Sequence, residues 1–333
     1  MPVTIPRSSA ALLTNLVDYA GLYPPAKLGM SAAVDNYATY LRSQESWMLG
    51  RFICPVSRLE ELRRESRGLL PTTDTHGEPA AQDDDLAPAQ APWRISAIID
   101  GDLDEDLDAI FAFNHEHQQP RNGLANIDAI ELKAGSPAAI DDALDSIPEE
   151  VYPFFEFPLA GDIRGFIAAL SGSDAAAKIR TGGVSPDAFP SCHAIAAFLI
   201  AASQADVPFK ATAGLHHPIR SEHPLTYEPN CPRGVMHGFL NLFLAACLVR
   251  SAQPTPTADS IANLLAEQSA SAFRVSGDSI QWINGSAGGG GGARAVLSVT
   301  ADQIRDTRET FATSFGSCSF DEPVEDLRAI KWL

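Results

Sequence analysis

Two segments, AAKIRTGG (residues 176–183) and PFKATAG (residues 208–214), share one pattern: a short apolar run carries a lysine and ends in glycine. Between them lies CHAIAAFLIAASQ (residues 192–204), whose length and apolar content predict a helix. A strand, a helix and a second strand in this order are typical of a parallel βαβ unit. Because the strands of such a unit are parallel, we expect Lys178 and Lys210 to lie on neighbouring strands at one depth.

The same alternation extends over the whole chain. We predict strands at residues 13–19, 48–54, 94–100, 127–133, 152–157, 176–180, 208–213 and 273–276, with helices between them and a last helix at 301–313. Eight strand–helix repeats in 333 residues predict one (β/α)8 barrel domain over residues 1–333. An open doubly wound sheet is the alternative, and it is disfavoured because no GxGxxG opens a helix after a strand.

The length above a minimal barrel is explained by loops. Residues 69–92 are rich in Pro, Ala and Asp, and residues 285–292 are rich in Gly. We expect both segments to be flexible excursions. Residues 217–235 are predicted to form a long proline-containing loop after the seventh strand.

Composition excludes several classes of function. The chain has 42 acidic and 24 basic residues, a net charge of −18, and no cluster of Lys and Arg that would form a local basic groove. Such a surface repels phosphate backbones, so no nucleic-acid partner is expected. No membrane association is expected either, because the longest apolar run, residues 238–249, is too short to span a bilayer. Five scattered cysteines without a CxxC pair favour a cytoplasmic location.

Charged residues inside the predicted strands are the main functional signal. They are Asp18, Arg51, Glu131, Lys133, Glu156, Lys178, Arg180 and Lys210. Barrel strands are buried on both faces, and an unpaired charge there would cost several kcal/mol. We therefore expect these side chains to pair at the carboxyl-terminal mouth of the barrel, where such barrels build their active sites.

The two lysines have a direct electrostatic consequence. At a separation of about 6 Å and an effective dielectric of about 20, their repulsion amounts to about 2.8 kcal/mol. That repulsion would lower the pKa of one lysine and make it a neutral nucleophile suited to Schiff-base chemistry. A tight ion pair of Lys178 with Glu156, or of Lys210 with Glu131, would act in the opposite direction.

The strand motifs resemble those of deoxyribose-phosphate aldolases, which are class I (Schiff-base) aldolases on a (β/α)8 barrel. The similar stretches are LVDY (16–19), IDAI (127–130), FFE (154–156), KIRTG (178–182), KATAG (210–214) and, more weakly, RVSGDS (274–279), which aligns with the last barrel strand of the family. The resemblance implies that Lys178 forms the Schiff base and that Lys210 lowers its pKa. It aligns Asp128 with the catalytic aspartate. Strand alternation puts Asp128 opposite Glu131 unless a bulge intervenes, and we prefer Glu131 as the acid/base because it shares a face with Lys133.

The sequence departs from the family after the seventh strand, where Leu215 and His216 follow Gly214 in place of a second glycine. This change weakens the phosphate cradle that the resemblance implies. His216 and His217 also raise the question of a metal, but no HExxH or HxH pattern supports one.

These observations predict a lysine-dependent aldolase or lyase acting on a small anionic carbonyl or sugar-phosphate-like substrate, without cofactor or metal. The expected catalytic residues are Lys178, Lys210 and Glu131, and the expected substrate-binding residues are Asp18, Lys133, Glu156, Arg180, Gly182, Gly214 and His216. One alternative is a barrel enzyme without a Schiff base, which clamps an anionic substrate with Lys and Arg and uses Glu as the base. Another is a non-catalytic barrel that binds a small molecule. A homo-oligomer is compatible with all three.

Overall fold

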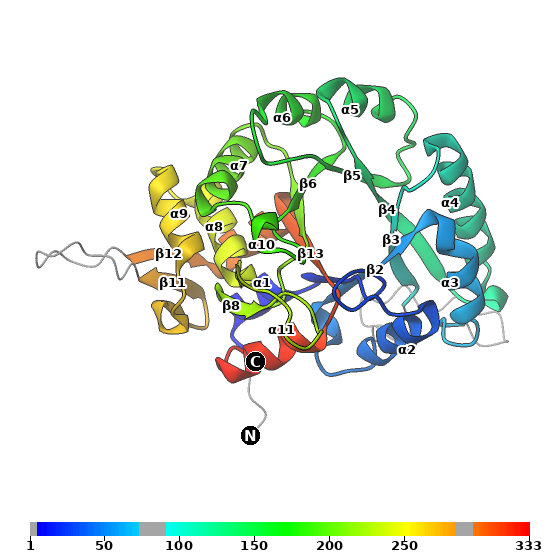
Figure 1. Ribbon diagram of the computed structural model, residues 1–333, viewed down its shortest axis with the longest axis horizontal. Coiled ribbons are helices and arrows are strands. Elements are labelled where there is room, and N and C mark those ends of the chain that lie inside the picture. Colours follow the sequence, from blue (N-terminus) through cyan, green and yellow to red (C-terminus); the bar gives the residue numbers. More distant parts are fainter. Residues whose placement is uncertain (1–4, 73–90, 284–295) are drawn as a thin grey trace, which may run out of the picture.

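The barrel predicted from the alternation is present. The computed structural model describes residues 5–72, 91–283 and 296–333. Eight parallel strands close in the order β1–β13–β7–β6–β5–β4–β3–β2 (Figure 1). They are β1 (Val17–Tyr19), β2 (Leu49–Pro55), β3 (Trp93–Ile98), β4 (Ala125–Lys133), β5 (Tyr152–Glu156), β6 (Ala176–Arg180), β7 (Phe209–Thr212) and β13 (Ala312–Ser317).

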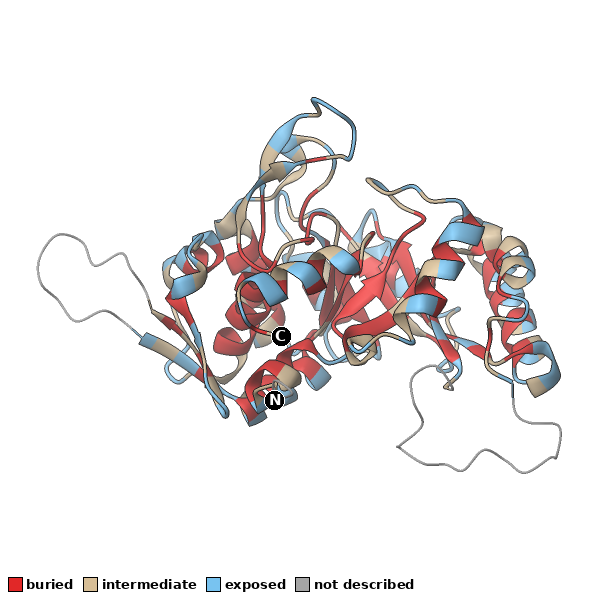
Figure 2. Cartoon of the chain, turned by 90° about the horizontal axis from the view of Figure 1, so that it is seen from below, coloured by how far each residue is buried: buried red, intermediate tan, exposed pale blue. Residues whose placement is uncertain are grey.

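Helices surround the barrel and bury their apolar faces against it, as the red inner and pale blue outer surfaces in Figure 2 show. They are α2 (Met30–Tyr40), α3 (Leu59–Glu65), α4 (Leu103–His117), α5 (Pro137–Leu144), α6 (Arg164–Leu170), α7 (Cys192–Gln204), α8 (Phe239–Ser251) and α10 (Ala301–Thr310). Several begin at a side chain that accepts hydrogen bonds from free backbone N–H groups. Asp102 caps α4, Ser191 caps α7, and Thr300 forms a capping box with Gln303 at α10.

Helix α8 explains the longest apolar run of the sequence. All its residues from Phe239 to Val249 are buried. A helix that is apolar on every side needs cover on every side. Here α7, α10, α9 (Ala258–Ala266) and β12 (Val296–Thr300) pack around it. Within the described ranges, no helix is both long enough and apolar enough to cross a membrane.

The closing strand differs from the prediction. Residues 273–276 were expected to be the eighth barrel strand, but β10 (Phe273–Val275) lies in a separate antiparallel sheet with β11 (Ser279–Ile283) and β12. The short 276–278 connection explains this difference, because a tight turn joins antiparallel strands and a parallel strand needs a long crossover. Helix α10 supplies that crossover, and β13 closes the barrel by pairing with β7 and β1.

Three smaller predictions are compared with the structure next. The first strand is shorter than expected, since Leu13 ends helix α1 (Arg7–Leu13). The predicted loop at 217–235 contains a hairpin, β8 (Ser221–Pro224) and β9 (Arg233–Met236). Of the predicted flexible excursions, residues 73–90 of the first and all of 285–292 lie outside the described residues. The chain ends in α11 (Asp321–Ala329), which follows β13.

Candidate active site

Strand register brings the two lysines together. Lys178 on β6 pairs with Lys210 on β7, and Glu156 on β5 pairs with Lys178 on its other side. Each side chain is therefore at the same level of the barrel as its neighbour, as expected from the repeated lysine–glycine pattern.

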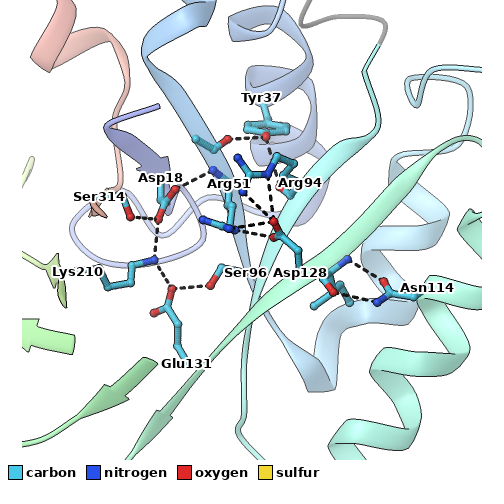
Figure 3. Close-up of polar contacts among 12 residues, drawn as sticks. Asp18, Tyr37, Arg51, Arg94, Ser96, Asn114, Asp128, Glu131, Lys210 and Ser314 are labelled. Carbon is cyan, nitrogen blue, oxygen red and sulfur yellow. Dashed lines mark hydrogen bonds and ion pairs between the residues drawn. The ribbon is translucent and has the colours of Figure 1, made fainter. Parts of the chain in front are cut away.

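Glu131 on β4 bridges the two lysines. Its Oε1 atom lies 2.7 Å from Nζ of Lys210, and its Oε2 atom lies 2.8 Å from Nζ of Lys178. Oε1 also accepts a hydrogen bond from the hydroxyl of Ser96 on β3, at 2.8 Å (Figure 3). A second carboxylate completes the surroundings of Lys178, because Oε2 of Glu156 lies 2.8 Å from its Nζ.

Lys210 is the buried member of the pair. Its side chain is fully buried and its Nζ atom donates to Asp18 Oδ2 at 2.6 Å (Figure 3). The same Asp18 carboxylate accepts hydrogen bonds from the hydroxyl of Ser314 and the backbone N–H of Arg51. Lys210 does not line the cavity described next, so it reaches a bound molecule only through Glu131.

A cavity of about 250 Å³ opens at the carboxyl-terminal ends of the strands. Glu131, Lys178, Arg180 and His216 supply its charged groups. Of the five lysines in the chain, Lys178 is the one that contributes to its wall. A second cleft of about 610 Å³ shares Glu131, Lys178 and Arg180 with the cavity and adds Lys133.

The electrostatics of Lys178 reverse the expectation from the sequence. Burial alone would lower its pKa, but the carboxylates of Glu131 and Glu156 outweigh burial and raise the pKa above its ordinary value. Burial opposes ionisation of Glu131 as well, yet the ammonium groups of Lys178 and Lys210 hold the pKa of this carboxyl far below its usual range. The prediction of a lowered pKa is therefore wrong for Lys178, because the lysine–lysine repulsion is offset by carboxylates in direct contact.

The remaining predicted binding residues lie in different environments. Arg180 donates through its guanidinium to Oε1 of Glu156 at 3.2 Å, so it is already paired. Lys133 is exposed at the end of β4 and has no carboxylate at ion-pair distance among the described residues. Gly182 and Gly214 pack against the ring of Phe189, which fills the space beside their α-carbons.

His216 belongs to a pair with the carboxyl-terminal helix. Its Nδ1 atom lies 3.0 Å from Oε2 of Glu322 on α11 and 3.9 Å from Sγ of Cys318. Burial would lower the pKa of His216, but its bonds to Cys318 and Glu322 raise it to about 9. The imidazole is therefore charged at neutral pH. Within the part of the chain that the structure describes, no cluster of His, Cys, Asp and Glu has the arrangement of a metal site.

Asp128 and Glu131 have different partners. The β3–β4 pairing is irregular at this point, since Ile95 pairs with Ile127 and Ser96 with Ala129. The Asp128 carboxylate bonds to the guanidinium groups of Arg51, at 2.6 Å, and Arg94, at 2.8 Å (Figure 3). Glu131 is therefore the β4 carboxylate that contacts both lysines.

Tyr23 was missed in the sequence analysis. It follows β1 and lines both the cavity and the neighbouring cleft. Its hydroxyl is buried and has no hydrogen-bond partner among the described residues. Burial raises the pKa of Tyr23 above its ordinary value, so the group stays protonated. The sequence holds a weak signal for it, a tyrosine in the loop LYPPA (residues 22–26) directly after a strand that carries a buried aspartate.

Comparison with known proteins adds no relative. No protein-family model matches the chain, and no curated protein or solved structure matches it significantly. The function is therefore inferred from the chemistry of the site.

Proposed function

We propose that the protein is a Schiff-base lyase of the aldolase type, with Lys178 as the nucleophile. One observation carries the proposal: Lys178 is the lysine that lines the cavity, and a carboxylate that it contacts, Glu131, is shared with a second, buried lysine. A nucleophilic lysine needs a nearby group to remove its proton and a site that binds the carbonyl beside it. Glu131, Glu156 and the cavity supply both.

The two carboxylates beside Lys178 stabilise both its ammonium form and the iminium intermediate. In the ligand-free protein Lys178 is an ammonium, held by two carboxylates at 2.8 Å. When a carbonyl compound binds, one of these carboxylates accepts a proton from Nζ, and the neutral amine attacks the carbonyl carbon. Loss of water then leaves an iminium, which carries the same positive charge as the ammonium. The carboxylates that stabilise one therefore stabilise the other.

Carbon–carbon cleavage follows from the same groups. Glu131 takes the proton of the hydroxyl at the β-carbon, the carbon–carbon bond breaks, and its electron pair moves into the iminium to give an enamine. Protonation of the enamine carbon and addition of water release the second product and restore the amine. Lys210 acts as a positioning residue, because it is fully buried and holds Glu131 in place from the side away from the cavity.

Reductive trapping tests the proposal. The wild-type protein is incubated with a panel of aldehydes and ketones and sodium borohydride, and the modified residue is identified by peptide mass mapping. We expect the adduct on Lys178 and at least a hundredfold loss of trapping in the Lys178→Ala variant. Lys133→Ala is the matched control, since Lys133 is an exposed lysine in the adjoining cleft, and it should trap like the wild type. An undiminished adduct in Lys178→Ala would contradict the proposal.

A second candidate is an enzyme that binds the carbonyl oxygen through the Lys178 ammonium and uses glutamate as the base. The raised pKa of Lys178, which the carboxylates of Glu131 and Glu156 maintain against burial, favours this alternative. It predicts turnover without a trappable adduct, and retention of part of that turnover in Lys178→Arg. A Schiff-base enzyme loses all turnover in that variant. A protein that only binds would show neither adduct nor turnover.

A further inference from the structure

The charges around the cavity are already balanced. Each cation in its wall has a carboxylate partner: Lys178 has Glu131 and Glu156, Arg180 has Glu156, and His216 has Glu322. Below them, Lys210 is held by Asp18 and Glu131. The sum over these four cations and four carboxylates is zero. An anionic group inside this cavity would have to displace one of these carboxylates or remain without a counter-charge, and both are costly in a buried site. Lys133, which has no carboxylate partner among the described residues, lies in the adjoining cleft and not in the cavity wall.

The ring of Phe189 occupies the Cβ side of two glycines at the strand ends. A phosphate bound by backbone N–H groups needs open space beside a glycine. A Cβ atom placed on Gly214 would lie 2.8 Å from the ring of Phe189, and one placed on Gly182 would meet the same ring. The space that the glycines leave is therefore filled by an aromatic side chain of the protein itself.

Apart from Thr212 and Cys318, the rest of the cavity wall is mainly apolar. Its side chains come from the loop after β1, from β2 and β3, and from the β8–β9 hairpin region; they include Tyr23, Pro24, Ile53, Ile98, Leu225 and Met236. Val184 continues this surface at the rim and is 46% exposed. Burial of an apolar group is favoured against such a wall. The cavity of about 250 Å³ accommodates a small molecule.

We infer that this cavity binds an uncharged carbonyl compound with a small apolar substituent. The inference rests on the proposed function for the role of Lys178. It changes the expected substrate class from the anionic or sugar-phosphate-like compound that the sequence suggested.

Matched aldehydes test the substrate class. Pentanal and succinic semialdehyde have similar length and differ in a terminal methyl or carboxylate group. Rates of adduct formation on Lys178 are measured for both and divided by their rates with a free lysine derivative. We expect pentanal to react at least tenfold faster on this scale, with glyceraldehyde 3-phosphate as slow as succinic semialdehyde. Equal rates, or a preference for either anion, would overturn the inference.

One matched pair of variants localises the effect. Val184→Arg adds an unpaired cation at the rim and should raise the rate with succinic semialdehyde, relative to the rate with pentanal, at least threefold. Val296→Arg is its control, because Val296 is similarly exposed but lies on β12, outside the cavity.

A binding measurement separates this inference from the proposed chemistry. Saturation-transfer NMR with pentan-1-ol and 4-hydroxybutyrate detects binding without any reaction at Lys178. Binding of the alcohol alone supports the uncharged ligand class even where no aldehyde is trapped, a result that would refute only the Schiff base. Binding of 4-hydroxybutyrate in preference to the alcohol would refute the ligand class while leaving the Schiff-base proposal standing.

Discussion

Replacing Glu156 by Gln tests how Lys178 is activated. The carboxylate lies 2.8 Å from Nζ of Lys178, and its side chain is 12% exposed. Two unit charges at this distance interact with about 6 kcal/mol at an effective dielectric of about 20 and with about 1.5 kcal/mol at the dielectric of water. Even the lower figure corresponds to about a tenfold change in an equilibrium. The Glu156→Gln variant should therefore hold at least about ten times more neutral Lys178 at pH 7.

The expected result is a faster reaction to the same end point. A less basic amine is a somewhat weaker nucleophile, so we expect the rate of iminium formation at pH 7 to rise about threefold or more. The final extent of iminium should not change, because the ammonium and the iminium carry the same charge and lose the same interaction. Mixing with pentanal and quenching with sodium borohydride after increasing times measures the rate, and the quenched adduct at the plateau measures the extent.

The pH profile and a control complete this test. The rate should rise with pH in the wild type, because Lys178 must lose a proton, and the rising limb should shift to lower pH in Glu156→Gln. Glu150→Gln removes an exposed carboxylate just before β5 and should behave like the wild type. A Glu156→Gln protein that is folded but reacts more slowly than the wild type would refute the idea that this carboxylate keeps the amine protonated.

Two further predictions concern the buried network. Lys210→Met leaves Asp18 and Glu131 without one of their cations, which should lower the free energy of unfolding by about 3–5 kcal/mol. For 333 residues the unfolding entropy is about 0.7 kcal/mol per degree, so the melting temperature should fall by about 4–7 °C. The loss should shrink between pH 8 and pH 5, because protonation relieves the unpaired carboxylates, and a loss independent of pH would argue against this cause. Glu322→Gln should lower the pKa of His216 from about 9, which an NMR titration shows directly with the other histidines as internal references. The pKa of His216 in the folded state exceeds its unfolded value of about 6.5. The His216–Glu322 pair therefore stabilises the protein fully below pH 6.5 and loses this contribution as pH rises through 9. The melting temperature should accordingly decline less over that pH window in the Glu322→Gln variant.

Local pattern was enough to predict most of the barrel. A parallel strand that is buried on both faces is a short apolar run, and the helix after it has its own apolar pattern, so both are recognisable from local sequence. Seven of the eight barrel strands were predicted within a few residues. The eighth was assigned to residues 273–276 instead of β13. The segment ATSFGS (residues 312–317) has small and polar residues that give little strand signal by themselves. It is a strand because β1 and β7 leave a gap of one strand between them, and only the closed barrel defines that gap.

The candidate site divides in the same way. The sequence shows which residues carry charge inside strands. It also predicts that Lys178 and Lys210 lie at one level, because the neighbouring strands of a βαβ unit are close in the chain. The partners of those charges depend on closure of the barrel. Asp18 and Glu131 meet Lys210 from strands that are 192 and 79 residues away in the chain. A nearby cation lowers the pKa of Lys178, whereas carboxylates in contact raise it. The distances across the barrel decide which effect is larger, so the direction of the pKa shift required the tertiary structure.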